Sequence, residues 1–261
     1  MPVDYTKQRL NYDTIAPLYD EPLRDHQVDS NLVLFLEQQP QLDPITVYVL
    51  DMGCGTGKQL AANSPRFPEV RLLGLDLFAG MLKQAQSRCR VVSWVQGDSS
   101  APPFRQGSIH YITNQFSYQH VQLRERMIAE TYRLLRPGGR FVMTNLDPWS
   151  MTGWVIYRYF PAARQRDFED FLPAETLTDL MGDAGFININ LSRSRQVSEV
   201  ELGELLNYAS QRFRTSQLMV LTEADYRHGL EKMRQEIEQA GGNPVRVKSE
   251  LSLVTIVGDK P

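Results

Sequence analysis

The stretch TVYVLDMGCGTGK, residues 46–58, decides the fold. Its first five residues are uncharged and mostly β-branched or aromatic, which is typical of a strand buried on both faces of a parallel sheet. Asp51 follows, and glycine then occupies every second position, at Gly53, Gly55 and Gly57. Because glycine permits tight turns and leaves the backbone bare, this loop allows a ligand to approach closely.

Residues 58–63 follow the last of these glycines and can begin a helix. The free N–H groups at that helix start would point towards a ligand over the loop. A strand, a glycine turn and a helix start together predict the nucleotide-binding half of an open α/β sheet. An ordinary glycine-rich turn is the alternative for this stretch alone, since a lone glycine pattern is a weak signal.

Composition narrows the class of protein. The chain has 261 residues, 42% of them hydrophobic and 23% charged, which predicts one globular body with elaborations. A net charge of −3 gives no general attraction to nucleic acid or to an anionic membrane, so we expect neither as a partner. We find no apolar stretch of about 20 residues and no apolar signal-peptide core, so no membrane insertion is expected.

The two cysteines, Cys54 and Cys89, lie on different predicted elements and cannot form a zinc cluster by themselves. We therefore expect no metal site. Two cysteines without a disulfide framework favour a reducing compartment, and the predicted localisation is cytoplasmic.

Further strands and helices alternate along the chain. Strands are predicted at 70–76, 91–95, 107–113, 140–146, 186–192 and 247–257, and helices at 25–38, 78–89, 122–135 and 173–184. The second strand ends at Asp76, 19 residues after Gly57, where a carboxylate can accept both hydroxyls of a ribose. A solvated aspartate at a strand end is the alternative interpretation of this residue.

Two later strand ends carry polar residues that we expect beside the same ligand. Asp98 and Ser99 follow the third strand, where an acid and a hydroxyl can hold the amino edge of an adenine. Residues 114–120, NQFSYQH, follow the fourth strand and should border the pocket, because ligands lie at the carboxyl ends of such strands.

The N-terminal residues 1–45 are predicted to form cap helices. Residues 5–20 are amphipathic at roughly helical spacing, although Pro17 prevents one long helix. This segment is either a packing helix or a flap over the ligand with the hydroxyls of Tyr12 and Tyr19 facing the pocket.

Four separated stretches now agree in order and spacing: VLDMGCGTG at 49–57, GLD at 74–76, QGD at 96–98 and LLRPGGRF at 134–141. Together they resemble the small-molecule branch of the class I S-adenosylmethionine-dependent methyltransferase family, over about residues 47–186. The resemblance implies a doubly wound, seven-stranded Rossmann-like α/β sheet with six parallel strands and the last antiparallel. It also implies S-adenosylmethionine as the cofactor.

The resemblance assigns roles to residues of this chain. Those expected beside the methionine part of the cofactor are Asp51, Gly53, Gly55, Gly57 and Asn114. Asp76 would bind the ribose, Leu77 would lie beside the adenine, and Asp98 and Ser99 would contact its amino edge. Tyr12 and Tyr19 resemble aromatic residues that close over the cofactor in relatives.

A dinucleotide-binding loop is disfavoured. Its fingerprint places glycine at the third residue after Gly55, where this chain has Lys58. That glycine allows close helix–strand packing beneath a pyrophosphate, so a nicotinamide-dependent dehydrogenase does not fit.

His120 occupies a place where many relatives carry a histidine, after the fourth strand. An unperturbed pKa of about 6.5 suits a base that takes a proton from the acceptor. A structural histidine at a helix start is the alternative, because the alignment of nucleophile, methyl group and sulfur can supply most of the rate without a base.

The predicted core comprises residues 46–196 and 247–261, within a single domain. Two insertions at 150–172 and 197–246 are expected to be helical, with Thr222 and Asp225 as a variant capping box. They are predicted to form a lid over a mainly apolar acceptor pocket. The alternative is that these helices form a dimerisation surface, so the sequence is compatible with a homodimer.

The predicted activity is transfer of a methyl group to O, N or C of a small organic acceptor. Two alternatives remain: a catalytically inactive relative that binds the cofactor and acts as a partner protein, and a methyltransferase of RNA or protein.

Overall fold

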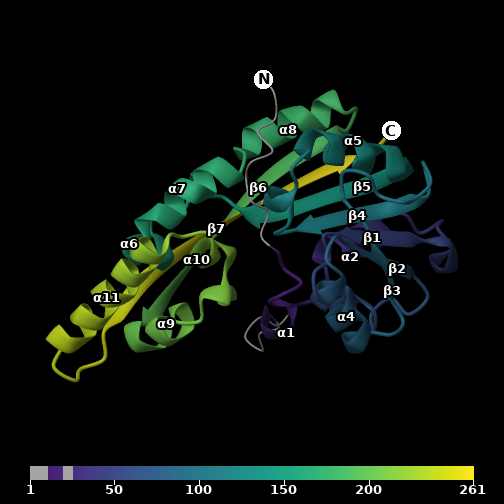
Figure 1. Ribbon diagram of the computed structural model, residues 1–261. Coiled ribbons are helices and arrows are strands. Elements are labelled where there is room, and N and C mark those ends of the chain that lie inside the picture. The colour runs from purple at the N-terminus through teal and green to yellow at the C-terminus, as the bar shows by residue number, and fades with distance from the viewer. Residues whose placement is uncertain (1–10, 20–25) are drawn as a thin grey trace. The chain divides into compact units, whose positions relative to one another are not determined.

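Seven strands form one sheet in the computed structural model, which describes residues 11–19 and 26–261 (Figure 1). The predictions that fall on residues 1–10 and 20–25 lie outside the described residues. The strand order is β3-β2-β1-β4-β5-β7-β6. The strands are β1 (Tyr48–Met52), β2 (Arg71–Asp76), β3 (Ser93–Gln96), β4 (Ile109–Gln115), β5 (Leu135–Leu146), β6 (Ile187–Glu201) and β7 (Arg246–Asp259).

The directions of the strands agree with the predicted fold class. β1 pairs in parallel with both β2 and β4, β2 pairs in parallel with β3, and β4 pairs in parallel with β5. β7 runs antiparallel to β5 and β6. Two hydrogen bonds show this for β5: Gly139 bonds to Lys260, the residue after β7, and Asp147, the residue after β5, bonds to Ser252, so the chain order is reversed. The prediction of six parallel strands with the last antiparallel is confirmed.

The chain divides into two compact units, each described here by itself. The first holds the described residues up to Thr144 together with 178–190 and 256–261, and the second holds 145–177 and 191–255. Helices of the first unit are α1 (Ala16–Tyr19), α2 (Ser30–Glu37), α3 (Lys58–Asn63), α4 (Ala79–Arg88) and α5 (Arg124–Leu134), and α8 (Ala174–Asp183) belongs to both units.

The first unit is organised around the predicted strand–turn–helix. Val49 and Leu50 of β1 and the preceding Val47 are completely buried, as expected for a central strand, and Leu60 of α3 packs in one core with Val47 and Val49. α3 begins and ends at the residues expected from the sequence. α2 begins at Ser30 and not at residue 25, because the carboxylate of Asp29 caps it by accepting from the N–H groups of Asn31 and Leu32.

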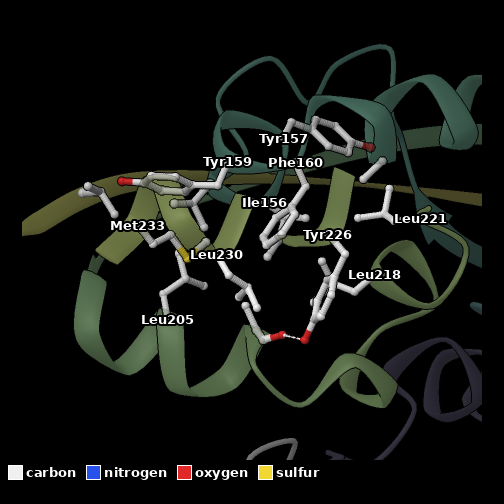
Figure 2. Close-up of a cluster of buried hydrophobic side chains, with 14 of the residues drawn as sticks. Ile156, Tyr157, Tyr159, Phe160, Leu205, Leu218, Leu221, Tyr226, Leu230 and Met233 are labelled. Carbon is white, nitrogen blue, oxygen red and sulfur yellow. Dashed lines mark hydrogen bonds between the residues drawn. The ribbon is translucent and has the colours of Figure 1, made fainter. Parts of the chain in front are cut away.

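The second unit has its own hydrophobic core, shown in Figure 2. Its helices are α6 (Val155–Tyr159), α7 (Pro161–Asp170), α9 (Leu202–Ala209), α10 (Ser216–Met219) and α11 (Glu223–Gln239). Tyr226 stacks on Phe160, with ring centroids 6.2 Å apart, and donates its hydroxyl hydrogen to the carbonyl oxygen of Ala209. The predicted cap is confirmed, since Thr222 accepts from the N–H of Asp225 at the start of α11.

The prediction that a helical insertion begins at residue 197 is wrong. β6 continues to Glu201, nine residues beyond its predicted end, and the helix predicted there is limited to α9. Residues 192–201 stay extended because β7 continues beside them, as the hydrogen bond from Leu202 N to Val245 O shows. Glu201 then caps α9 through the N–H groups of Gly203 and Glu204.

β5 also begins earlier than the predicted residue 140. Its ladder with β4 includes Ile109 opposite Leu135, with a register shift before Tyr111 opposite Arg140. Residues 136–139 belong to β5 but form an irregularity in it, since Gly138 has a φ of 75° and donates to the carbonyl of Lys260, the residue that follows β7. Among the described residues, no helix is both long enough and apolar enough to cross a membrane.

Candidate functional site

A cavity in the first unit opens where β1, β2, β3 and β4 end. Nine of the twelve predicted site residues line it: Tyr12, Tyr19, Gly53, Gly55, Asp76, Leu77, Asp98, Ser99 and His120. Asp51, Gly57 and Asn114 do not line the cavity but lie on the strand and loop segments that border it. The carboxyl ends of adjacent parallel strands share one edge, which brings Gly53, Asp76 and Asp98 together, and Tyr12 of the N-terminal segment reaches the same cavity through its contact with His120.

The glycine turn lies against this cavity with all three glycines at positive φ. A Cβ atom on Gly55 would meet nothing within 4 Å, so the backbone of Gly55 is open towards the cavity. A Cβ atom on Gly53 would lie 2.1 Å from the hydroxyl oxygen of Ser117. Gly57 is needed for packing, because a Cβ atom there would lie 2.4 Å from the Trp94 ring.

Asp76 ends β2 with its carboxylate held by backbone groups. One oxygen accepts from the N–H of Gly55 at 2.8 Å, and the other accepts from the N–H of Phe78 at 2.9 Å. A carboxylate has about four acceptor positions, so both oxygens retain a lone pair for a ligand hydroxyl. Burial raises the pKa of Asp76 and the two N–H groups oppose that rise.

Asp51 is buried at the end of β1, and its Oδ1 has no hydrogen-bond partner among the described residues. Burial, followed by the negative charges of Asp29 and Asp76, raises the pKa of Asp51 to about 8. A buried carboxylate with one unpartnered oxygen fits a cationic group, because a positive charge beside it would favour the ionised form. The α-ammonium of the predicted cofactor is such a group.

Asp51→Asn is expected to flatten the dependence of stability on pH. With a folded pKa near 8 against an ordinary 3.8, the carboxyl contributes stability that is complete below about pH 4 and is lost as pH rises towards 8. The melting temperature of the variant relative to the wild type should therefore rise between about pH 5 and about pH 8.5. Thermal melts of both proteins across this range provide the measurement, and parallel curves would contradict the account.

His120 and Tyr12 both line the cavity and contact each other. The hydroxyl of Tyr12 lies 3.1 Å from Nε2 of His120, and the amide nitrogen of Gln119 lies 3.2 Å from the same atom. Because an amide nitrogen only donates, Nε2 is assigned as an acceptor, which places the ring proton on Nδ1. The Tyr12 ring also packs against Tyr19 and Phe78, with centroids 5.7 Å and 5.4 Å apart.

Asn114 and Asp98 shape the loops around the cavity. The amide of Asn114 donates to the carbonyl of Met52 at 2.6 Å and so ties the end of β4 to the end of β1. Asp98 accepts from both the N–H and the hydroxyl of Ser100, each at 2.8 Å. This turn brings Ser99 to the cavity surface.

Three apolar lining residues were not expected: Phe78, Met81 and Val121. Phe78 and Met81 follow Asp76 by two and five residues. Their position at the start of the helix that follows Asp76 is the sequence signal from which they could have been predicted. Phe116 was expected only as part of the bordering run 114–120. It has a φ of 53°, an unusual conformation for a bulky residue that often marks functional sites.

The charge of the cavity favours a cation. Asp76 and Asp98 line it, and no lysine or arginine is found among the described lining residues. A site for pyrophosphate would require positive charge or several converging N–H donors. The cavity is therefore suited to a ligand that combines hydroxyl groups, a flat apolar part and a positive charge.

Comparisons with known proteins agree with this geometry. A family model described as "Methyltransferase domain" matches residues 49–139. The malonyl-acyl-carrier-protein O-methyltransferase of Methylococcus capsulatus is 30% identical over 195 residues, covering 70% of this chain and 67% of that protein. The 2-phytyl-1,4-naphthoquinone methyltransferase of Thermosynechococcus vestitus is 29% identical over 205 residues, covering 67% and 88% respectively.

Solved structures show the same fold at low sequence identity. A methyltransferase attributed to an antibiotic biosynthesis pathway of Anabaena variabilis is similar with a TM-score of 0.65 and 17% identity, covering 89% of this chain and 99% of that one. A phosphoethanolamine N-methyltransferase of Haemonchus contortus, solved with S-adenosylhomocysteine, has a TM-score of 0.56 and 18% identity, covering 95% of this chain and 57% of that one.

Proposed function

Because this chain belongs to the class I S-adenosylmethionine-dependent methyltransferase family, we propose that its cavity holds the cofactor by the residues described above. The enzyme transfers a methyl group from S-adenosylmethionine to a small organic acceptor. The observation that carries the proposed site is the cavity itself, in which a buried carboxylate at the end of β2 faces a bare glycine backbone.

The proposed roles follow from the contacts of each residue. Asp76 binds the ribose hydroxyls with the lone pairs that Gly55 and Phe78 leave available. Phe78 and Leu77 supply apolar surface for the adenine. Asp51 balances the α-ammonium group. When bound, S-adenosylmethionine supplies a methyl group activated by its sulfonium.

Calorimetric titration with S-adenosylhomocysteine tests the site, and a labelled-methyl screen tests the acceptor. The names of the relatives suggest the first compounds, namely naphthoquinones and malonyl-acyl-carrier protein. Phenols, amines and other small acids complete the screen, since the acceptor atom is open between O, N and C. If S-adenosylhomocysteine binds but none of the acceptors is methylated, the proposed acceptor class is contradicted. If S-adenosylhomocysteine does not bind, the proposed site is contradicted.

His120→Asn is expected to lower kcat by about 100-fold while changing the S-adenosylhomocysteine affinity by less than about twofold. The proposed reason is that Nε2 of His120, assigned as the unprotonated nitrogen beside Tyr12 and Gln119, takes the proton of the acceptor once the acceptor displaces these two groups from its one lone pair. The loss of kcat should be greatest for acceptors of low reactivity. An unchanged kcat would show that alignment alone carries the reaction.

We propose that residues 150–172 and 197–246, which lie in the second unit, choose the acceptor. They share a hydrophobic core of their own, within which helices such as α9 and α11 pack against each other, so they can be exchanged together. Replacing these residues with those of a relative should change the acceptor and leave S-adenosylhomocysteine affinity unaltered. Loss of cofactor affinity in the exchanged protein would count against this assignment.

A cytosolic, reducing location is likewise proposed, supported by Cys54 and Cys89 both being free thiols. We also propose a homodimer, and the surface that supports it is argued below.

A further inference from the structure

β6 is the last strand of the sheet and has an open edge. It is 15 residues long, and residues 192–199 within it are all exposed. Among residues 11–19 and 26–261, no other strand pairs with its outer side. Natural proteins rarely leave so long an edge uncovered, because unpaired N–H and C=O groups form a template for another strand.

The orientation of the backbone shows which residues face this edge. The N–H of Leu202, which directly follows β6, donates at 2.8 Å to the carbonyl of Val245, which directly precedes β7, so the backbone groups of Leu202 point inwards, to the side on which β7 lies. Successive residues of a strand alternate in direction, so the odd-numbered residues from Arg193 to Glu201 direct theirs outwards. Val197 lies at the centre of this segment and is 54% exposed.

The side chains of these odd-numbered residues share one face of the sheet and read Arg193, Arg195, Val197, Glu199 and Glu201. Two positive charges, one apolar residue and two negative charges form a row that is complementary to itself when reversed. Directly opposite residues in an antiparallel pair share a face, so complementary charges at those positions stabilise the pairing and like charges oppose it.

We propose that two copies of this chain associate by antiparallel pairing of β6 with β6 about a two-fold axis at Val197. This register places Val197 opposite Val197, Arg195 opposite Glu199 and Arg193 opposite Glu201. A shift of the axis by one residue in either direction places a charged residue opposite Val197 and keeps only half of the charge matches. The proposal names the surface of the homodimer proposed above and does not depend on the methyl-transfer chemistry.

Contacts within the chain leave the inner pair available. Arg195 contacts Glu250 at 2.5 Å, yet its side chain is 60% exposed and a guanidinium has five N–H donors. Glu199 lies 3.9 Å from Arg246, and both side chains are largely exposed. Arg193 is more fully engaged, by two carboxylates of its own chain, so the outer pair is expected to contribute less than the inner pair.

The test uses sedimentation equilibrium of the whole chain. The wild type is expected to dimerise, and Arg195→Glu and Glu199→Arg should each raise the dissociation constant by about tenfold or more, because each variant places like charges opposite each other. Mixing the two variants should restore association. In the mixed dimer, the copy carrying Arg195→Glu faces the copy carrying Glu199→Arg, so opposite charges meet at that pair and the remaining pairs are native. Failure of the mixture to associate would count against the proposed register.

A backbone variant gives an independent readout. Val197→Pro removes an outward N–H and should abolish the dimer while leaving the melting temperature of the monomer almost unchanged. Ser198→Pro, the matched control, removes an inward N–H and should lower the melting temperature. A wild type that stays monomeric at about 100 μM, near the weak end of specific association, would overturn the proposal, as would a dimer unaffected by Val197→Pro. Methyl transfer is assayed separately on the same samples.

Discussion

Replacing Asp76 with alanine is expected to weaken S-adenosylhomocysteine binding by about 100-fold or more. A hydrogen bond to a charged group contributes about 1.5–3 kcal/mol, and the carboxylate is proposed to accept two ribose hydroxyls. Asp76→Asn keeps one acceptor oxygen and should show an intermediate loss. Calorimetric titration measures both affinities at a pH near neutrality.

The control for Asp76 is Asp43→Ala. Asp43 also accepts from a backbone N–H, that of Ile45, but it lies in an exposed position outside the cavity. Its replacement should leave affinity unchanged. Because alanine at position 76 leaves the N–H groups of Gly55 and Phe78 without their partner, melting curves must show that the variant is folded. A folded Asp76→Ala protein with native affinity would refute the proposed role.

Gly57→Ala is expected to lower the melting temperature by about 5–20 °C. Gly57 has a φ of 75°, and a non-glycine residue there costs about 1–3 kcal/mol. The new Cβ would also lie 2.4 Å from the Trp94 ring and 2.9 Å from Cβ of Ala85, which adds about 1–3 kcal/mol of overpacking. For a chain of this size each kcal/mol shifts the melting temperature by about 2–4 °C.

Gly55→Ala is the matched control for Gly57→Ala. Gly55 also has a positive φ, of 53°, but a Cβ atom there would meet nothing within 4 Å. The melting temperature of Gly55→Ala should therefore fall only by the conformational cost of the positive φ. Its main effect should be a loss of cofactor affinity, since the backbone of Gly55 faces the cavity. Equal destabilisation by the two substitutions would show that contact with Trp94 is not what requires glycine at position 57.

The nucleotide-binding half of the fold could be predicted because its signals are local. A buried strand, a glycine turn and a helix start all occur within residues 46–63, and the structure places α3 at the predicted residues. Asp76 could be found for the same reason, since a strand that ends in an acid is visible in the sequence. The adjacency of strands then brings Ser99 and His120 to the same cavity.

Other features depend on partners far away in the sequence and could not be predicted. The glycine at position 57 is required by Trp94, which lies on β3, and no local pattern reveals that contact. The extension of β6 to Glu201 depends on β7, which begins only at Arg246, and pairing overrode a weak helical pattern. The raised pKa of Asp51 results from burial beside other carboxylates, which only the folded chain assembles.

The central claim is that the carboxylate of Asp76 and the backbone of the glycine turn bind neighbouring parts of one cofactor, the ribose and the amino-acid part. A crystal structure of the protein with S-adenosylhomocysteine tests this most directly. We predict electron density for the ribose within hydrogen-bonding distance of Asp76 and for the amino-acid part beside Gly53 and Gly55. Density for the ligand outside this cavity, or its reversed orientation within it, would contradict the account.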